Sequence, residues 1–166
     1  MILAGFLTLP RLKPLFFCPE QFSMGTPRTM PDIHGGDGFA VLDGRAKVMD
    51  EHGVDLTEKM VLGAAHMLAL AKTHQAELAI LTDMSAACGS QVISDGCRLV
   101  EHRKYQRGVG VAAAMLLRSG IAVVSQRDHR SMGKIREKLE PGYQADPNAI
   151  DHHEIEWYRT YFKTVQ

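Results

Sequence analysis

The sequence has few cysteines, and those present show no pairing pattern. Three cysteines occur in 166 residues, namely Cys18, Cys88 and Cys97, and no two of them form a C-x-x-C pair. An odd number of cysteines without such pairs argues against a secreted disulfide framework and against a zinc ribbon. We therefore expect the protein to work in a reducing, cytoplasmic environment.

The sequence also lacks an excess of charge and lacks a long apolar run. Nineteen basic residues balance nineteen acidic ones, so no overall positive field would attract nucleic acid or an anionic membrane. The opening residues 1–9 are apolar, but they have no basic flank, and Pro10 and Arg11 end them far short of a bilayer span. We expect no nucleic acid partner, no membrane partner and no signal peptide, and a small molecule is the expected ligand.

The remaining composition is that of a globular protein. Hydrophobic residues make up 45% of the chain and charged residues 23%, which is enough apolar material for a buried core. We expect a single domain over residues 1–166, with its core at about 14–125 and a helical C-terminal extension at 126–166.

The order of apolar segments predicts an α/β fold. Short apolar runs at 14–18, 77–82 and 121–125 predict buried strands, and the segments 55–75 and 108–120 predict helices between them. Asp43-Gly44, between 39–42 and 45–49, predicts a small β-hairpin, because this dipeptide accepts the positive φ of a tight turn. The strand–helix–strand order favours parallel neighbours. The expected fold is a three-layer, Rossmann-like and mostly parallel sheet, with a small β-hairpin insertion and a helical C-terminal tail.

Two of the thiols follow predicted strands. Cys18 ends the run 14–18, and Cys88 lies in the loop Ser85-x-x-Cys-Gly89 after the strand at 77–82. Since the carboxyl ends of parallel strands face one crevice, we expect Cys18 and Cys88 to reach a shared ligand. Soft thiolates select zinc, copper(I) or an iron–sulfur cluster. A redox disulfide and a coincidence of two buried core thiols are the alternatives.

Two further patterns are weaker. The run Asp151-His-His-Glu154 could bind a metal, but adjacent histidines do not share one helical face, so a solvated capping segment is the alternative. Gly108-Val-Gly110 does not complete a dinucleotide-binding glycine pattern and has no strand directly before it, so it does not indicate a phosphate site.

Several short motifs occur together in a specific order. They are Cys18-Pro-Glu20, Thr26-Pro-Arg28, Gly35-Gly-Asp-Gly38, Leu42-Asp-Gly-Arg-Ala46, Ser85-x-x-Cys-Gly89, Asp95-Gly96 and Leu117-Arg-Ser-Gly-Ile121. In this order, from about Pro14 to Ser125, they resemble the domain-of-unknown-function 523 family, which includes the thiouracil desulfidases.

The resemblance implies a specific chemistry. It implies a [4Fe–4S] cluster held by three cysteines and a hydrolytic, non-redox desulfuration of thiolated nucleobases or related thiocarbonyl compounds. Cys18 and Cys88 match two of the ligands, and Ser85 matches a serine near the substrate. Glu20, the nearest acid to Cys18, is the candidate for proton transfer, and Asp83 is the second choice.

The resemblance leaves the third ligand open. The family's first cysteine lies at the end of an N-terminal strand in a Cys-Leu-Leu-Gly type motif, which this sequence does not contain. Cys97, after Asp95-Gly96, is the candidate third ligand, and an incidental substitution is the alternative. The sequence therefore also allows a shortened reading frame, or a non-catalytic paralogue or small-ligand-binding module that has lost the cluster.

Residues for substrate binding follow from the same motifs. Arg28 offers a planar fork of donors to an anionic or carbonyl ligand, and Thr26, Gly89 and Ser90 are expected beside it. In this hypothesis the backbone amides around Gly89 form the other polar wall of the pocket. A surface arginine paired with a local carboxylate is the alternative for Arg28.

Overall fold

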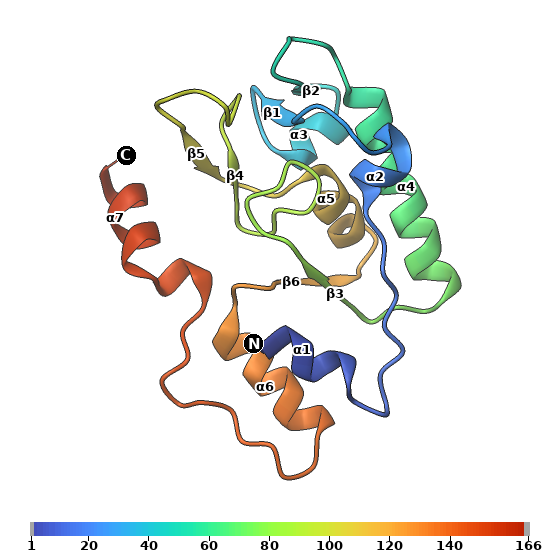
Figure 1. Cartoon of the computed structure of the whole chain (residues 1–166), viewed down its shortest axis with the longest axis vertical. Coiled ribbons are helices and arrows are strands. Elements are labelled where there is room, and N and C mark those ends of the chain that lie inside the picture. Colours follow the sequence, from blue (N-terminus) through green and yellow to red (C-terminus); the bar gives the residue numbers. More distant parts are fainter. Residues whose placement is uncertain (1, 165–166) are drawn as a thin grey trace. The chain divides into compact units, whose positions relative to one another are not determined.

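The computed structural model describes residues 2–164 and consists of two compact units (Figure 1). One unit comprises residues 17–123, and the other combines the chain up to residue 16 with the chain from residue 124 onward. Within residues 2–164, no helix is both long enough and apolar enough to cross a membrane. The single-domain organisation expected from the sequence stays a prediction.

The unit of residues 17–123 alternates short strands with helices. Its elements are α2 (Pro19–Met24), β1 (Asp32–His34), α3 (Gly38–Leu42), β2 (Lys47–Met49), α4 (Thr57–Thr73), β3 (Leu78–Leu81), β4 (Val92–Ser94), β5 (Tyr105–Arg107) and α5 (Val111–Arg118), and β6 (Ala122–Ser125) follows at its end. Strand β1 pairs antiparallel with β2, and β4 pairs antiparallel with β5. Strands β3 and β6 form the parallel pair. The α/β class predicted from the sequence is confirmed, although the strands form three two-stranded sheets.

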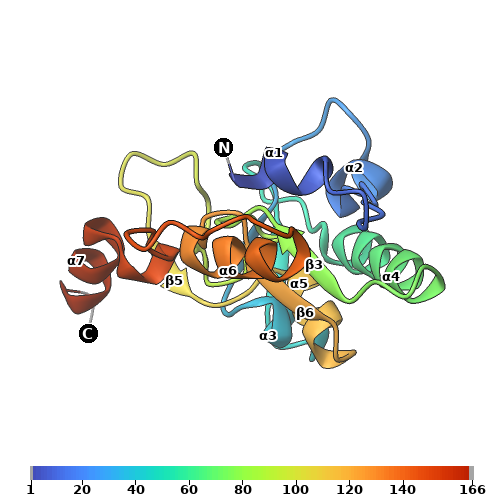
Figure 2. The ribbon, with the colours of Figure 1, turned by 90° about the horizontal axis from the view of Figure 1, so that it is seen from below.

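The helices of this unit enclose its apolar core. Helix α4 lies against α2 and α5, as Figures 1 and 2 show. Five residues from different elements are completely buried between them, namely Ile33, Val48, Met60, Ile93 and Val111. Gly63 on α4 allows the close approach of α2, because a Cβ there would collide with the Pro19 carbonyl. The residues that follow Cys18 are thereby held against the core.

The other unit is helical apart from its share of β6. It contains α1 (Ile2–Leu7), α6 (His129–Leu139), the 3-10 helix η1 (His152–Glu154) and α7 (Glu156–Thr164). Helix α1 contacts α6. Aromatic side chains of α7 pack on one another and on His152, whose ring lies 6.1 Å from that of Trp157. The helical C-terminal tail expected from the sequence is therefore present.

The β-hairpin predicted around Asp43-Gly44 is wrong. Residues 38–42 form α3, because the Asp37 side chain accepts a hydrogen bond of 3.1 Å from the Ala40 amide and so caps the helix. Asp43 then ends the helix, and Gly44 supplies the positive φ of 71° after it. The Asp-Gly pair terminates a helix instead of joining two strands.

The strand predicted at 14–18 is also wrong. These residues form neither a strand nor a helix, and Phe16 is 77% exposed. Pro19 starts α2, since its fixed φ and missing N–H suit the first turn of a helix. Cys18 therefore lies at the N-cap of a helix and not at the end of a strand.

Candidate functional site

The loop after β3 is organised by one carboxylate. The Oδ1 atom of Asp83 accepts hydrogen bonds from the amides of Ser90, Gln91 and Val92 at 2.9, 3.2 and 3.3 Å. It also accepts one from the Met84 amide at 3.1 Å. Asp83, which is 3% exposed, thus ties the two ends of the loop together. Four backbone amides thus engage its Oδ1 atom, and a role of Asp83 in proton transfer stays a prediction.

The same loop is docked on the start of α5. The amides of Val111 and Ala112 donate to the carbonyls of Ala86 and Ala87, both at 2.9 Å, and so satisfy first-turn donors that a helix cannot satisfy itself. Gly110 allows this approach, because a Cβ there would collide with the Ala87 carbonyl group. The glycines before α5 therefore serve packing, in agreement with the absence of a phosphate pattern in the sequence.

The hydroxyl of Ser85 connects this loop to α2. Its Oγ accepts hydrogen bonds from the amides of Ala87 at 3.2 Å and Cys88 at 3.1 Å. The same Oγ donates to Oε1 of Glu20 at 3.1 Å, although 65 residues separate the two in the sequence. Two donors thus fix the hydroxyl and direct its proton at Glu20.

Glu20 joins this hydroxyl to an arginine. It lies in the first turn of α2, and its side chain is 12% exposed. Its Oε2 accepts from Arg28 Nε at 3.2 Å and Arg28 Nη2 at 2.9 Å. The structure therefore pairs Arg28 with a carboxylate, the alternative left open by the sequence, and that carboxylate belongs to the candidate site itself.

The thiols of Cys18 and Cys88 lie in the same neighbourhood. Cys18 is exposed, and its Sγ accepts from the Gln21 amide at 3.4 Å. Ser85 joins Cys88 to Glu20, because its Oγ accepts from the Cys88 amide and donates to Glu20. Burial, with smaller contributions from the charges of Glu20 and then Cys18, raises the pKa of the Cys88 thiol to about 12. Cys88 is therefore a neutral thiol at pH 7 in the absence of a cation.

Cys97 lies in a different loop of the same unit. It is half-buried in the loop after β4, and its Sγ accepts from the Leu99 amide at 3.4 Å. Among residues 2–164, the three cysteines do not form a group whose sulfur atoms all lie within 4.8 Å of one another. The assignment of Cys97 as a third ligand stays a prediction.

The loop that carries Cys97 is held by the next residue. Arg98 donates from its backbone amide to Oδ2 of Asp32 at 2.8 Å and pairs through Nε with Oδ1 at 2.6 Å. Its guanidinium also donates to the carbonyls of Pro31 and Met84, at 2.9 and 3.2 Å. Arg98 thus joins β1, the Ser85 loop and the Cys97 loop. The sequence contained no signal for this residue, because its partners are 14 to 67 residues away.

The backbone amides around Gly89, expected from the sequence to form one polar wall of the pocket, are already hydrogen-bonded within their own loop. The amide of Gly89 donates to the Ser85 carbonyl at 2.8 Å, and the Ser90 amide is bound by Asp83. Gly89 also has no room for a side chain, since a Cβ would lie 2.7 Å from Ile93 Cγ2. Ser90 does keep a buried Oγ that has no hydrogen-bond partner among the described residues. Thr26 is exposed beside Arg28 in the sequence, and its binding role, like that of Ser90, stays a prediction.

The sequence profile of the 2-thiouracil desulfurase family matches residues 6–128. The chain belongs to this family. It is 39% identical over 117 residues to the uncharacterized protein YbbK of Bacillus subtilis (strain 168), a match that covers 70% of this chain and 76% of YbbK. The resemblance drawn from the sequence motifs is confirmed.

A solved structure has a fold similar to that of this chain. The chain is similar to the [4Fe-4S]-dependent thiouracil desulfidase TudS, with a TM-score of 0.61 and 28% sequence identity. The match covers 75% of this chain and 75% of the TudS chain. The similarity in fold therefore extends over most of the chain.

Proposed function

We propose that this protein is an iron–sulfur-dependent desulfidase that hydrolyses the carbon–sulfur bond of thiolated nucleobases or related thiocarbonyl compounds in a reducing cytoplasm. The observation that carries the proposal is the hydrogen bond between Ser85 and Glu20 beside the thiols of Cys18 and Cys88. Family membership and the similarity to TudS support it.

Two of the thiols in this part of the chain, those of Cys18 and Cys88, fit a thiophilic metal cofactor. Cys18 and Cys88 would hold a [4Fe–4S] cluster, which would supply an iron atom able to take the sulfur of the substrate. Binding would have to remove the proton of Cys88, as metal binding does at any thiol, so the pKa of about 12 makes loading more favourable as pH rises. Cys97 is the proposed third ligand.

The polar residues of the site would handle protons and orientation. The reaction consumes the thiocarbonyl and one water, and it yields a carbonyl and hydrogen sulfide without oxidation or reduction. Glu20 would accept a proton of the attacking water, directly or through Ser85, whose hydroxyl already donates to it. Arg28 would hold the other carboxylate oxygen and so keep Oε1 directed at Ser85.

Metal content and turnover of the same preparations test this proposal. The chain is purified without oxygen, iron and acid-labile sulfide are measured, and sulfide release from 2-thiouracil is followed. Cys18→Ser and Cys88→Ser should lose iron and turnover together. Glu20→Gln should keep its iron and lose roughly 10²- to 10⁴-fold in turnover, because it removes only the proton acceptor.

The outcome for Cys97 decides between the catalytic and the non-catalytic hypothesis. Loss of iron in Cys97→Ser, as complete as in Cys18→Ser, would identify it as the third ligand. A chain that binds 2-thiouracil but holds no iron and releases no sulfide would instead be a binding module. Sulfide release by Cys88→Ser at the rate of the parent would refute the proposed site.

A further inference from the structure

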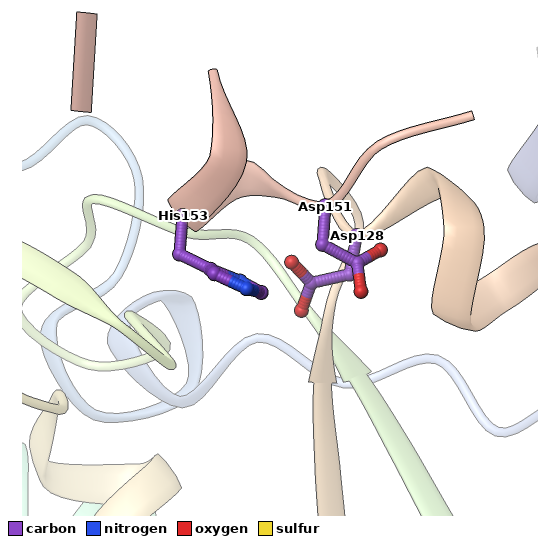
Figure 3. Close-up of side chains that lie close together, drawn as sticks. All are labelled: Asp128, Asp151 and His153. Atoms are coloured by element: carbon purple, nitrogen blue, oxygen red, sulfur yellow. The ribbon is translucent and has the colours of Figure 1, made fainter. Parts of the chain in front are cut away.

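A second cluster of ligand residues lies in the unit that contains the C-terminal helices. Asp128, Asp151 and His153 each direct one ligand atom toward the others, and these atoms all lie within 4.8 Å of one another (Figure 3). The cluster combines two carboxylates with an imidazole, so it has the donor types of a metal site and not only a local excess of acid.

The chain brings these residues together from two segments. Asp128 follows β6 at the start of α6, and Asp151 and His153 lie at the start of η1. Both carboxylates are buried, with exposed fractions of 6% for Asp128 and 8% for Asp151, whereas His153 is exposed. The cluster therefore has two fixed oxygen donors and one nitrogen donor that can adjust from the surface.

Hydrogen bonds orient both carboxylates. Asp128 accepts from the His152 amide at 3.0 Å on Oδ1 and from the Ser125 amide at 3.2 Å on Oδ2. Asp151 accepts from Ser131, through the amide at 2.9 Å on Oδ1 and through the hydroxyl at 2.6 Å on Oδ2. The Asp151 side chain also accepts from the Glu154 amide in a capping box. Supporting donors of this kind hold the carboxylates of metal sites in place.

The sequence run Asp151-His-His-Glu154 contributes only two of its members. Glu154 is engaged elsewhere, because its Oε1 accepts from Arg130 at 2.7 Å and its Oε2 accepts from the Asp151 amide at 2.9 Å. His152 is buried and stacks on Trp157. The third ligand position is taken by Asp128, which lies 23 residues before Asp151 in the sequence.

We propose that Asp128, Asp151 and His153 bind a divalent transition-metal ion, with zinc as the best match. Zinc bonds to imidazole nitrogen and carboxylate oxygen are about 2.0–2.2 Å long, so two ligand atoms at a tetrahedral angle on one zinc lie about 3.3–3.6 Å apart. The three ligand atoms here lie within 4.8 Å of one another, and the exposed His153 ring can rotate to bring its nitrogen closer to the two carboxylates. A divalent ion also offsets the repulsion between two carboxylates held side by side. Three protein ligands leave one position of a tetrahedral ion for water.

Zinc titration of the chelator-treated full-length chain tests this site. The readouts are calorimetric zinc binding and the fluorescence of Trp157, the only tryptophan of the chain. His153→Ala should weaken zinc binding at this site by more than the roughly 10- to 100-fold that loss of a supporting hydrogen bond costs. Ser131→Ala, which removes such a support from Asp151, should weaken it by about 10-fold.

Matched variants separate this site from the thiols. Cys18→Ser combined with Cys88→Ser should remove any zinc held by sulfur and leave the binding that depends on His153. His74→Ala removes an exposed histidine outside the cluster and should bind zinc as the parent does. Because His153 is exposed, its replacement does not depend on refolding of a core. Equal zinc affinity of the His153→Ala and parent chains, or no zinc binding by the doubly substituted chain, would overturn the proposal.

Discussion

Cys88 is a thiol that its surroundings keep protonated. It is half-buried, its backbone amide is bound to Ser85, and the carboxylate of Glu20 opposes a second negative charge nearby. A thiolate is the reactive form of cysteine in alkylation and metal binding. Whether Cys88 is an unreactive thiol or a reactive thiolate therefore depends on whether a cation is bound beside it.

Alkylation measures this property directly. At pH 8, a thiol with a pKa of about 12 has roughly one part in 10⁴ as thiolate, so Cys88 should react very slowly with iodoacetamide. Exposed Cys18 is the internal comparison and should be modified first. Mass spectrometry of the peptides after timed quenching gives both rates. Equal rates for the two thiols in the metal-free chain would contradict the raised pKa.

Arg28 gives a second prediction for a single residue. Arg28→Lys replaces a planar fork by one ammonium group, so Glu20 loses one of two parallel donors. Because the pair is partly exposed, the free energy of unfolding should change by less than about 1 kcal/mol. Turnover should fall by about 10-fold or more, because Glu20 is no longer held in one orientation. Urea denaturation and sulfide release measure the two effects, and unchanged turnover would exclude a positioning role.

The sequence predicted site residues where local motifs carried them. Cys18, Glu20, Ser85 and Cys88 lie in short motifs, and the structure brings all four together. Arg98 and Asp128 could not be found in this way, because their roles depend on partners far along the chain. The sequence also gave no means to see that the amides near Gly89 are used inside their own loop.

At the scale of the element, the long periodic segments were predictable and the short ones were not. Helices α4 and α5 and strands β3 and β6 occur where the apolar patterns placed them. The runs 14–18 and 39–42 are too short for a hydrophobic period to show whether they are helix or strand. The start of a helix decided their structure instead, at Pro19 after Cys18 and at the Asp37 cap before α3. Helix initiation thus outweighed apolar character in both cases.

The docking of the Ser85 loop on α5 gives a prediction for an element. Gly110→Ala would place a Cβ against the Ala87 carbonyl and would force the loop away from the first turn of the helix. We expect a loss of about 1–3 kcal/mol in the free energy of unfolding, because the opposing atoms are backbone and cannot rotate away. Gly5→Ala is the control, since the Cβ there meets only the movable end of Arg136. Urea denaturation measures the free energy of unfolding of both variants. Equal values for Gly110→Ala and Gly5→Ala would contradict the close contact at Gly110.

At the scale of the whole molecule, the raised pKa of Cys88 links stability to pH. The unfolded chain loses this proton near pH 9.0 and the folded chain near pH 12, so the folded state binds the proton more tightly. The stabilisation is therefore complete below pH 9 and is lost as pH rises from 9 toward 12.

The size of this effect can be measured between pH 8 and pH 10.5. Over this interval Cys88 should contribute a decrease of about 2 kcal/mol in the free energy of unfolding. Cys88→Ala should show a correspondingly smaller decrease in urea denaturation over the same interval. A parent and a variant with parallel pH dependence would show that Cys88 titrates alike in both states.

The attachment of four amides to Asp83 has a consequence for the kinetics of ligand capture. A flexible loop that closes on its ligand loses conformational entropy at that moment, and both its affinity and its association rate decrease accordingly. The loop of Ser85 and Cys88 already has its shape without a ligand, because Asp83 and the first turn of α5 hold its backbone. Association at this loop should then be governed by diffusion and by removal of water from the thiols, and not by ordering of the polypeptide.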